Sequence, residues 1–421
     1  MSLITKFVKL YGFILPIFIL FQVLVLIIRV QGLRNSQLLV DVGTKIIGHQ
    51  NPYDPPQPYG GFPGLIYLAI VKLSFSNSPW IFISLNIVGV VLLLNYLLPS
   101  STGYAKMTIL SVLLFTSPIR ALTANVQHTG VILGSCILAT YLFAKKKNNK
   151  NIFFMNFIGC SLFIFALEIK PQIAFPFIIT WFIINRRLAL FFAFIGEIFV
   201  IHVSIDLWVH DILELKLLGV WEIMHTNPQA ISEQISIWKL LSLFSSLDLL
   251  QISFMLYAII LITIISAAIV KPSNQLLKFA LVIPMLTAYL HLYDIIIIAI
   301  IICYWLVENK NKFYTTFLLG MLIIPTDLNS INQYLYSSIY IIAVTIALLY
   351  GKEKISLKDI LLHTCQIILA YFTMALISFW DKPLEVRASL QISLTMIIVI
   401  YLSSRKKLPS RITIANYYRR Y

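Results

Sequence analysis

The feature that most constrains this chain is the recurrence of apolar stretches along its whole length. A helix needs roughly 20 apolar residues to cross the hydrocarbon core of a bilayer, and somewhat fewer where helices pack closely or re-enter. Fourteen segments approach this length: residues 11–30, 79–98, 105–118, 128–144, 152–168, 172–184, 188–206, 248–270, 276–290, 294–307, 313–325, 334–350, 360–379 and 388–403. The sequence therefore predicts an all-α polytopic membrane protein with about 12–14 spans.

The composition supports the same class. Hydrophobic residues make up 59% of the 421 residues and charged residues 12%, whereas soluble domains have about 45–50% and about 25%. These values exclude a soluble enzyme, a secreted domain and a disordered regulator. The four cysteines lie singly within apolar runs, which predicts small core residues rather than a disulfide framework or a metal site.

The distribution of charge predicts the orientation. Of the 32 Lys and Arg residues, 22 fall in loops that share one side when the N-terminus is cytoplasmic, and 8 fall in the opposite loops. The positive-inside rule then places both termini of this multi-pass protein in the cytoplasm. This bias explains the net charge of +15 without nucleic acid as a partner. Thirteen of the 17 acidic residues lie on the outer, periplasmic side, so carboxylate chemistry is expected there.

Four polar clusters lie in these outer loops. The first outer loop, residues 31–61, carries Asp41 and a rigid Asn-Pro-Tyr-Asp-Pro-Pro turn that includes Tyr53. The other clusters contain Arg120, Gln127 and His128, then Glu168, Lys170 and Gln172, and finally His291, Tyr293 and Asp294. Ionisable groups at membrane depth cost about 3 kcal/mol or more unless they are paired or face water, so each cluster is a functional-site hypothesis.

Structural explanations of these clusters stay open. Glu168 with Lys170, and His291 with Asp294, could each be a pair that fixes a helix end. The first outer loop could be a solvated linker. The basic tail 404–421 fits contact with anionic membrane lipids. The sequence has no phosphate-binding Walker loop, dinucleotide fingerprint or HExxH motif, so no cofactor and no metal site are expected.

Taken in order, the outer loops resemble those of the polyprenol-phosphate-mannose-dependent alpha-1,2-mannosyltransferases, glycosyltransferase family 87 of the GT-C superfamily. The matching residues are Asp41, the GHQNPY segment Gly48–Tyr53, Phe62-Pro63, Asn125-Val126-Gln127, Lys170-Pro171-Gln172, and His291 with Tyr293-Asp294. The resemblance covers roughly residues 10 to 300. Two departures from the family pattern are Val126, where the family has glycine, and the VGTKII segment after Asp41, where the family has aromatic residues.

The resemblance implies a GT-C-like helix bundle that acts as one glycosyltransferase unit over residues 1–421. Residues 1–300 would form the catalytic module, and residues 301–421 would add C-terminal helices. The enzyme would lie in the plasma membrane, the bacterial inner membrane, with its active site on the outer, periplasmic face. It would transfer a sugar, mannose or another hexose or pentose, from a polyprenyl-phosphate donor to a hydroxyl of a lipid-linked, glycan or glycoprotein acceptor, with inversion.

The resemblance also implies residue roles. Asp41 would be the general base. The substrate-binding residues would be Lys170, Arg120, His128, Gln127, His291, Asp294 and Tyr53. Two alternatives are an O-antigen polymerase or ligase, and a lipid or solute transporter.

Overall fold

The computed structural model describes residues 44–45, 48–50, 80–99, 101, 103–114, 116, 118–119, 128–144, 151–208, 236–243, 249–286, 292–307, 312–324 and 357–405. Across these ranges the fold is built from helices and contains no strand. The helices are α4 (Trp80–Leu97), α5 (Gly103–Leu113), α7 (Thr129–Phe143), α8 (Ile152–Ile169), α9 (Pro171–Asn185), α10 (Leu188–Trp208), α13 (Ile237–Leu241), α14 (Leu249–Val270), α15 (Asn274–Val282), α16 (Ile296–Val307), α17 (Lys312–Ile323), α19 (Leu357–Phe379) and α20 (Leu384–Arg405). Two 3-10 turns, η1 (Ile283–Leu286) and η2 (Leu292–Ile295), precede and follow residues 287–291.

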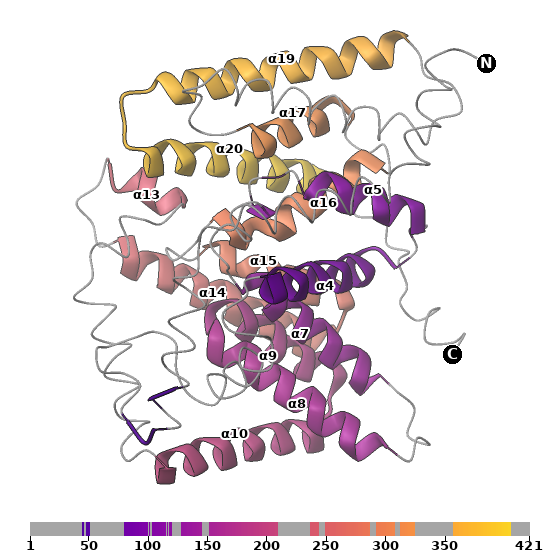
Figure 1. Cartoon of the computed structure of the whole chain (residues 1–421), viewed down its shortest axis with the longest axis vertical. Helices are drawn as coiled ribbons and strands as arrows, with labels where there is room; N and C mark the ends of the chain where they lie inside the picture. Colours follow the sequence, from indigo (N-terminus) through magenta and orange to yellow (C-terminus); the bar gives the residue numbers. More distant parts are fainter. Residues whose placement is uncertain are drawn as a thin grey trace.

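The helices stack along the longest axis of the molecule (Figure 1). The C-terminal helices α19, α17 and α20 form one end, and α10 lies at the other end beside α8. Between them, α4, α7, α8 and α9 pack together, α9 contacts α14 and α15, and α16 packs against α5 and α17. The centre of the molecule is therefore built from segments that are far apart in the sequence.

Most predicted spans coincide with a helix. Twelve of the fourteen predicted ranges fall on described helices, while 11–30 and 334–350 lie outside the described residues. Three described helices are both long and apolar enough to cross a membrane: Ile152–Ile169, Ile252–Val270 and Leu361–Phe379. Seven shorter apolar helices accompany them in the described part of the chain. The α-helical class is thus confirmed for these residues, whereas the number of spans stays a prediction.

The helices differ from the predicted span ranges at two places. The range 276–290 is not one continuous α-helix, because the α-helix ends at Val282 and a 3-10 turn containing Pro284 follows. Proline lacks the N–H that an α-helix interior needs. Arg387, which the sequence places in an outer loop, lies in the first turn of α20 and donates to the Ser378 carbonyl at 2.6 Å.

Side chains join helix ends that the predicted topology places on one side. Arg187, just before α10, donates to the carbonyl of Phe143 at the end of α7 (2.7 Å). Lys278 of α15 donates to the carbonyl of Leu97 at the end of α4 (3.4 Å). Cations at these positions also stabilise the negative ends of the helix dipoles. The contacts agree with the predicted alternation of loops, while the orientation stays a prediction from the charge count.

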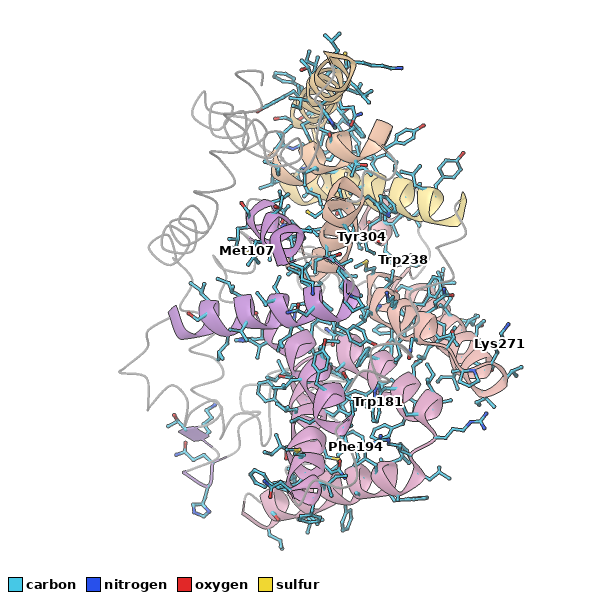
Figure 2. All side chains as sticks on the ribbon, turned by 90° about the vertical axis from the view of Figure 1, so that its right-hand side faces the viewer. Met107, Trp181, Phe194, Trp238, Lys271 and Tyr304 are labelled. Atoms are coloured by element: carbon cyan, nitrogen blue, oxygen red, sulfur yellow. The ribbon has the colours of Figure 1, made fainter. Side chains whose placement is uncertain are left out.

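An aromatic cluster fills the core between α7, α8, α9 and α10. Phe163 packs edge-on against Trp181 and Phe194, with ring centroids 5.7 and 6.3 Å apart. Trp181 and Phe194 lie in the lower half of the molecule, where these helices meet (Figure 2). Edge-to-face pairs of this kind favour one fixed arrangement of the rings. The aromatic cluster therefore fixes α7, α8 and α9 relative to one another, and with them the residues at the ends of these helices.

Candidate functional site: a buried lysine, threonine and aspartate

The site begins at the break between α8 and α9. Lys170 is the single residue between these helices, with φ −141° and ψ 77°. Pro171 follows it, and a residue before proline is disfavoured in the helical region, so the chain turns extended at Lys170 and restarts as α9. Proline is well suited to the first position of α9 because an N–H there would lack an intrahelical acceptor. The Lys-Pro dipeptide thus fixes where the lysine leaves the helix.

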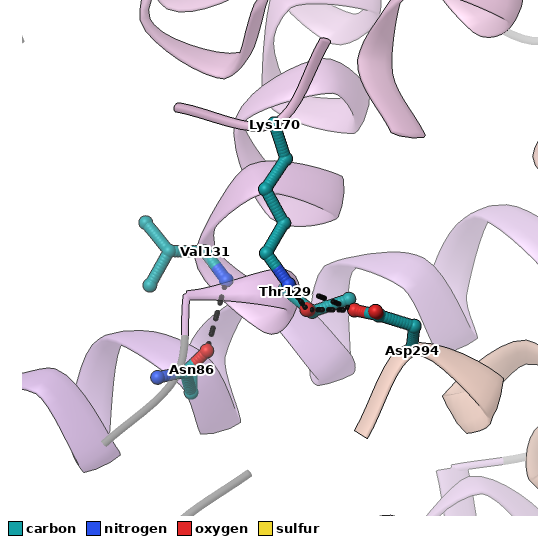
Figure 3. Close-up of polar contacts among 5 residues, drawn as sticks. All are labelled: Asn86, Thr129, Val131, Lys170 and Asp294. Atoms are coloured by element: carbon teal, nitrogen blue, oxygen red, sulfur yellow. Dashed lines mark hydrogen bonds and ion pairs between the residues drawn. The ribbon is translucent and has the colours of Figure 1, made fainter. Parts of the chain in front are cut away.

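Lys170 forms a closed network with two residues that are distant in sequence. Its ammonium donates to Asp294 Oδ1 at 2.9 Å and to Thr129 Oγ1 at 3.0 Å. The Thr129 hydroxyl donates to the same oxygen of Asp294 at 2.6 Å (Figure 3). Thr129 starts α7, and Asp294 belongs to η2, directly before α16. The network therefore ties the ends of three helical segments together.

All three residues are buried. The exposed fractions are 3% for Lys170, 0% for Thr129 and 6% for Asp294. Burial lowers the pKa of the Lys170 ammonium, and the Asp294 carboxylate opposes that shift. An isolated charge in such a place costs several kcal/mol, and the opposite charge of the partner offsets part of that cost.

His128 lies directly before α7 and is also buried, with 3% exposed. A neutral imidazole can both donate and accept a hydrogen bond. The substrate-binding role expected of His128 stays a prediction.

The start of α7 is held by a neighbouring helix. The side-chain oxygen of Asn86, on α4, accepts the backbone N–H of Val131 at 3.1 Å (Figure 3). Val131 is the third residue of α7, so its N–H has no acceptor within the helix. Asn86 is buried, with 1% exposed. It acts as an N-terminal cap from another helix and fixes where Thr129 points.

The structure brings together three of the predicted site residues, namely Lys170, Asp294 and His128. Asp41, Tyr53, Arg120, Gln127 and His291 lie outside the described residues, so their placement stays a prediction. Lys170 forms an ion pair with Asp294, which belongs to another predicted cluster.

Sequence reasoning missed two residues of this region. Thr129 looks like one more small residue at the start of an apolar run, and Asn86 like one amide in an apolar helix. A lone amide in an apolar helix is a recognisable signal, because buried amides need hydrogen-bond partners. In the described part of the chain, no group of three or more His, Cys, Asp or Glu side chains is arranged to hold a metal ion.

Fold and site together define a helical protein with apolar helices suited to a membrane and a buried ionic network at their ends. Comparison with protein-family models, with curated proteins and with solved structures finds no match for this chain.

Proposed function

We propose that this chain is a membrane glycosyltransferase that takes a sugar from a polyprenyl-phosphate donor and transfers it to a hydroxyl acceptor on the outer face of the plasma membrane. The observation that carries the proposal is the meeting of Lys170, Thr129 and Asp294 in one hydrogen-bond network. Lys170 and Asp294 come from two of the clusters that give the family resemblance, and Thr129 directly follows His128 of a third polar cluster. Independent structural pairs would not require the three clusters to meet.

The proposed reaction assigns a role to each part. Asp41 takes the proton of the acceptor hydroxyl while its oxygen attacks the anomeric carbon. The bond between that carbon and the phosphate oxygen breaks, and the electron pair leaves on the phosphate. The product phosphate gains negative charge, and a cation such as Lys170 or Arg120 stabilises it. Gln127, His128, His291, Asp294 and Tyr53 are the further substrate-binding residues of the proposal.

The proposal includes the architecture that the resemblance implies. The chain would be a GT-C-like bundle of about 12–14 spans, with a catalytic module in residues 1–300 and additional helices in residues 301–421. The prenyl chain of the donor would lie between apolar helices, so that a membrane-bound substrate could reach the site from the bilayer.

A transporter is the second candidate, and two features favour it. The first is the buried Lys170–Asp294 pair, since such pairs occur along ion pathways. The second is Glu197, a carboxyl in the middle of α10 that accepts a hydrogen bond from Ser161 at 2.5 Å. Transport would require no bond cleavage in a lipid-linked sugar, so the two candidates differ in their products.

The first prediction tests this difference. The purified protein is incubated with polyprenyl-phosphate mannose, glucose and arabinose, together with a membrane extract as acceptor source. We expect one donor to be consumed and its sugar to appear on an acceptor. Asp41→Asn keeps the size of the side chain but removes its basicity, so transfer should fall by about 100-fold or more.

Asp54→Asn is the matched control, because Asp54 lies in the proline-rich turn of the same loop. It should retain most of the transfer rate. Full activity of Asp41→Asn together with inactive Asp54→Asn would move the base to Asp54. Uptake or flipping of a lipid-linked sugar without transfer would favour the transporter instead.

A further inference from the structure

The Asp294 carboxylate occupies a position that favours an anion. It accepts hydrogen bonds from the Lys170 ammonium and the Thr129 hydroxyl through one oxygen. Thr129 is also the first residue of the 15-residue helix α7, and the positive end of a helix dipole favours a negative group. Resting on the proposed function, we propose that the donor phosphate takes this position by displacing Asp294 from Lys170. Asp294 then competes with the phosphate for the Lys170 ammonium, and this competition replaces the direct substrate-binding role given to Asp294 above.

The charges of Lys170 and Asp294 favour a phosphate that replaces the Asp294 carboxylate over one that binds beside it. Lys170 and Asp294 together carry no net charge, and both are buried. A phosphate arriving next to an ionised Asp294 would place two negative charges within a few ångströms of each other, which strongly disfavours one of them. A phosphate that replaces the carboxylate keeps the local charge balanced. The entering ligand therefore requires Asp294 to move away or to take up a proton.

The local structure supplies the groups for such an exchange. The Thr129 hydroxyl accepts from Lys170 and donates to Asp294, and after the exchange it can donate to a phosphate oxygen instead. Asp294 lies on the four-residue 3-10 turn η2. The hydrogen bonds of such turns are weaker than those of an α-helix, so a shift of Asp294 costs less there than inside α16.

If the phosphate displaces Asp294, the Asp294→Asn variant should be less stable and yet bind a prenyl phosphate more tightly. The amide keeps the size of the side chain but leaves the Lys170 ammonium without its counter-charge. Without ligand the variant should be less stable than the wild type. Farnesyl phosphate, a short prenyl phosphate, should then bind the variant about tenfold more tightly than the wild type, because it no longer competes with a carboxylate. It should also raise the melting temperature of the variant by more than that of the wild type.

Three controls isolate the charge effect. Lys170→Met should lose most of the affinity for farnesyl phosphate. Glu197→Gln removes a carboxyl from a membrane helix away from the network and should bind as the wild type does. Farnesol, which has the same chain without the phosphate, should show no difference between Asp294→Asn and the wild type.

A second measurement uses the wild-type protein, so that it does not depend on the folding of Asp294→Asn. Farnesyl phosphate should increase the reaction of Asp294 with a hydrophobic carbodiimide, measured by mass spectrometry of its peptide. Carbodiimides react with protonated carboxyls, and a carboxyl that has left its ammonium partner in a buried site takes up a proton. The modification of Glu197 in the same sample should stay unchanged.

Different results would contradict the displacement of Asp294 and the proposed glycosyltransferase function. Equal or weaker binding by Asp294→Asn, with binding lost in Lys170→Met, would overturn the exchange and leave the phosphate-binding role of Lys170 intact. Unchanged or reduced reactivity of Asp294 in the wild type would overturn it as well. Absence of farnesyl phosphate binding in every variant, including the wild type, would instead count against the proposed function.

Discussion

For the individual residues, removing only one partner of the Lys170–Asp294 ion pair should cost more stability than removing both. Taking away one partner leaves an uncompensated buried charge, which costs about 3–5 kcal/mol, whereas taking away both removes the cost along with the attraction. We therefore predict that Lys170→Met and Asp294→Leu each destabilise the protein strongly. The double variant should lose much less stability than the two single losses added together.

Thermal unfolding of the four proteins in one detergent measures this coupling. Thr129→Val provides a milder comparison, because it removes the hydroxyl but neither charge. It should cost about 1–3 kcal/mol, the usual consequence of removing one buried hydrogen-bond partner. Additive losses in the double variant would mean that the two side chains stabilise the protein independently of one another.

At the scale of elements, the position of α7 depends on its close crossing with α4. A Cβ atom on Gly89 would overlap the carbonyl oxygen of Gly130, and one on Gly134 would overlap the backbone of Gly89. Small residues at such crossings let membrane helices approach each other closely. The same crossing brings Asn86 to the start of α7, so helix packing and the geometry of the site are linked here.

We predict that Gly89→Ala forces α4 and α7 apart, and that it lowers both the melting temperature and any activity that depends on Lys170. Overpacking of this kind typically costs about 1–3 kcal/mol. The matched control is Gly196→Ala, in the interior of α10, where a Cβ meets no atom within 4 Å. It should be neutral or slightly stabilising, because alanine is the better helix former. Equal behaviour of the two variants would contradict the close crossing.

At the scale of the whole molecule, the topology can be tested at two exposed turns. Asp381 lies between α19 and α20, and Arg186 lies between α9 and α10; both are exposed. The charge distribution places Asp381 outside and Arg186 in the cytoplasm. In a Cys365→Ser background, Asp381→Cys in intact cells should therefore react with a membrane-impermeant maleimide, and Arg186→Cys should not.

Permeabilised cells provide the control for this labelling, since both cysteines should react there. The other native cysteines of the described region, Cys136, Cys160 and Cys303, are buried and should contribute little background. Labelling of Arg186→Cys alone in intact cells would reverse the orientation. It would also move the site of Lys170 and Asp294 to the cytoplasmic side.

The helical class and most helix positions in the described residues follow from the sequence alone. Apolar runs of this length leave the backbone few alternatives in a membrane, because every N–H and C=O must be satisfied within the segment. The break at Lys170 also follows from the sequence, because the Lys-Pro pair acts on backbone angles locally. The helices near Pro284 and Arg387 differ from the predicted ranges, because hydropathy alone does not show where an α-helix gives way to a 3-10 turn or begins.

The contacts between side chains of different helices could be seen only in the tertiary structure. Glu168 lies in the last turn of α8, and Lys170 is the non-helical residue that follows this helix. The partner that the structure gives Lys170, Asp294, lies 124 residues further along the chain. The contacts of Thr129 and Asn86 arise in the same way, from the packing of α7 against α4 and η2. Such contacts depend on how helices cross in space, and no local pattern of residues encodes those crossings.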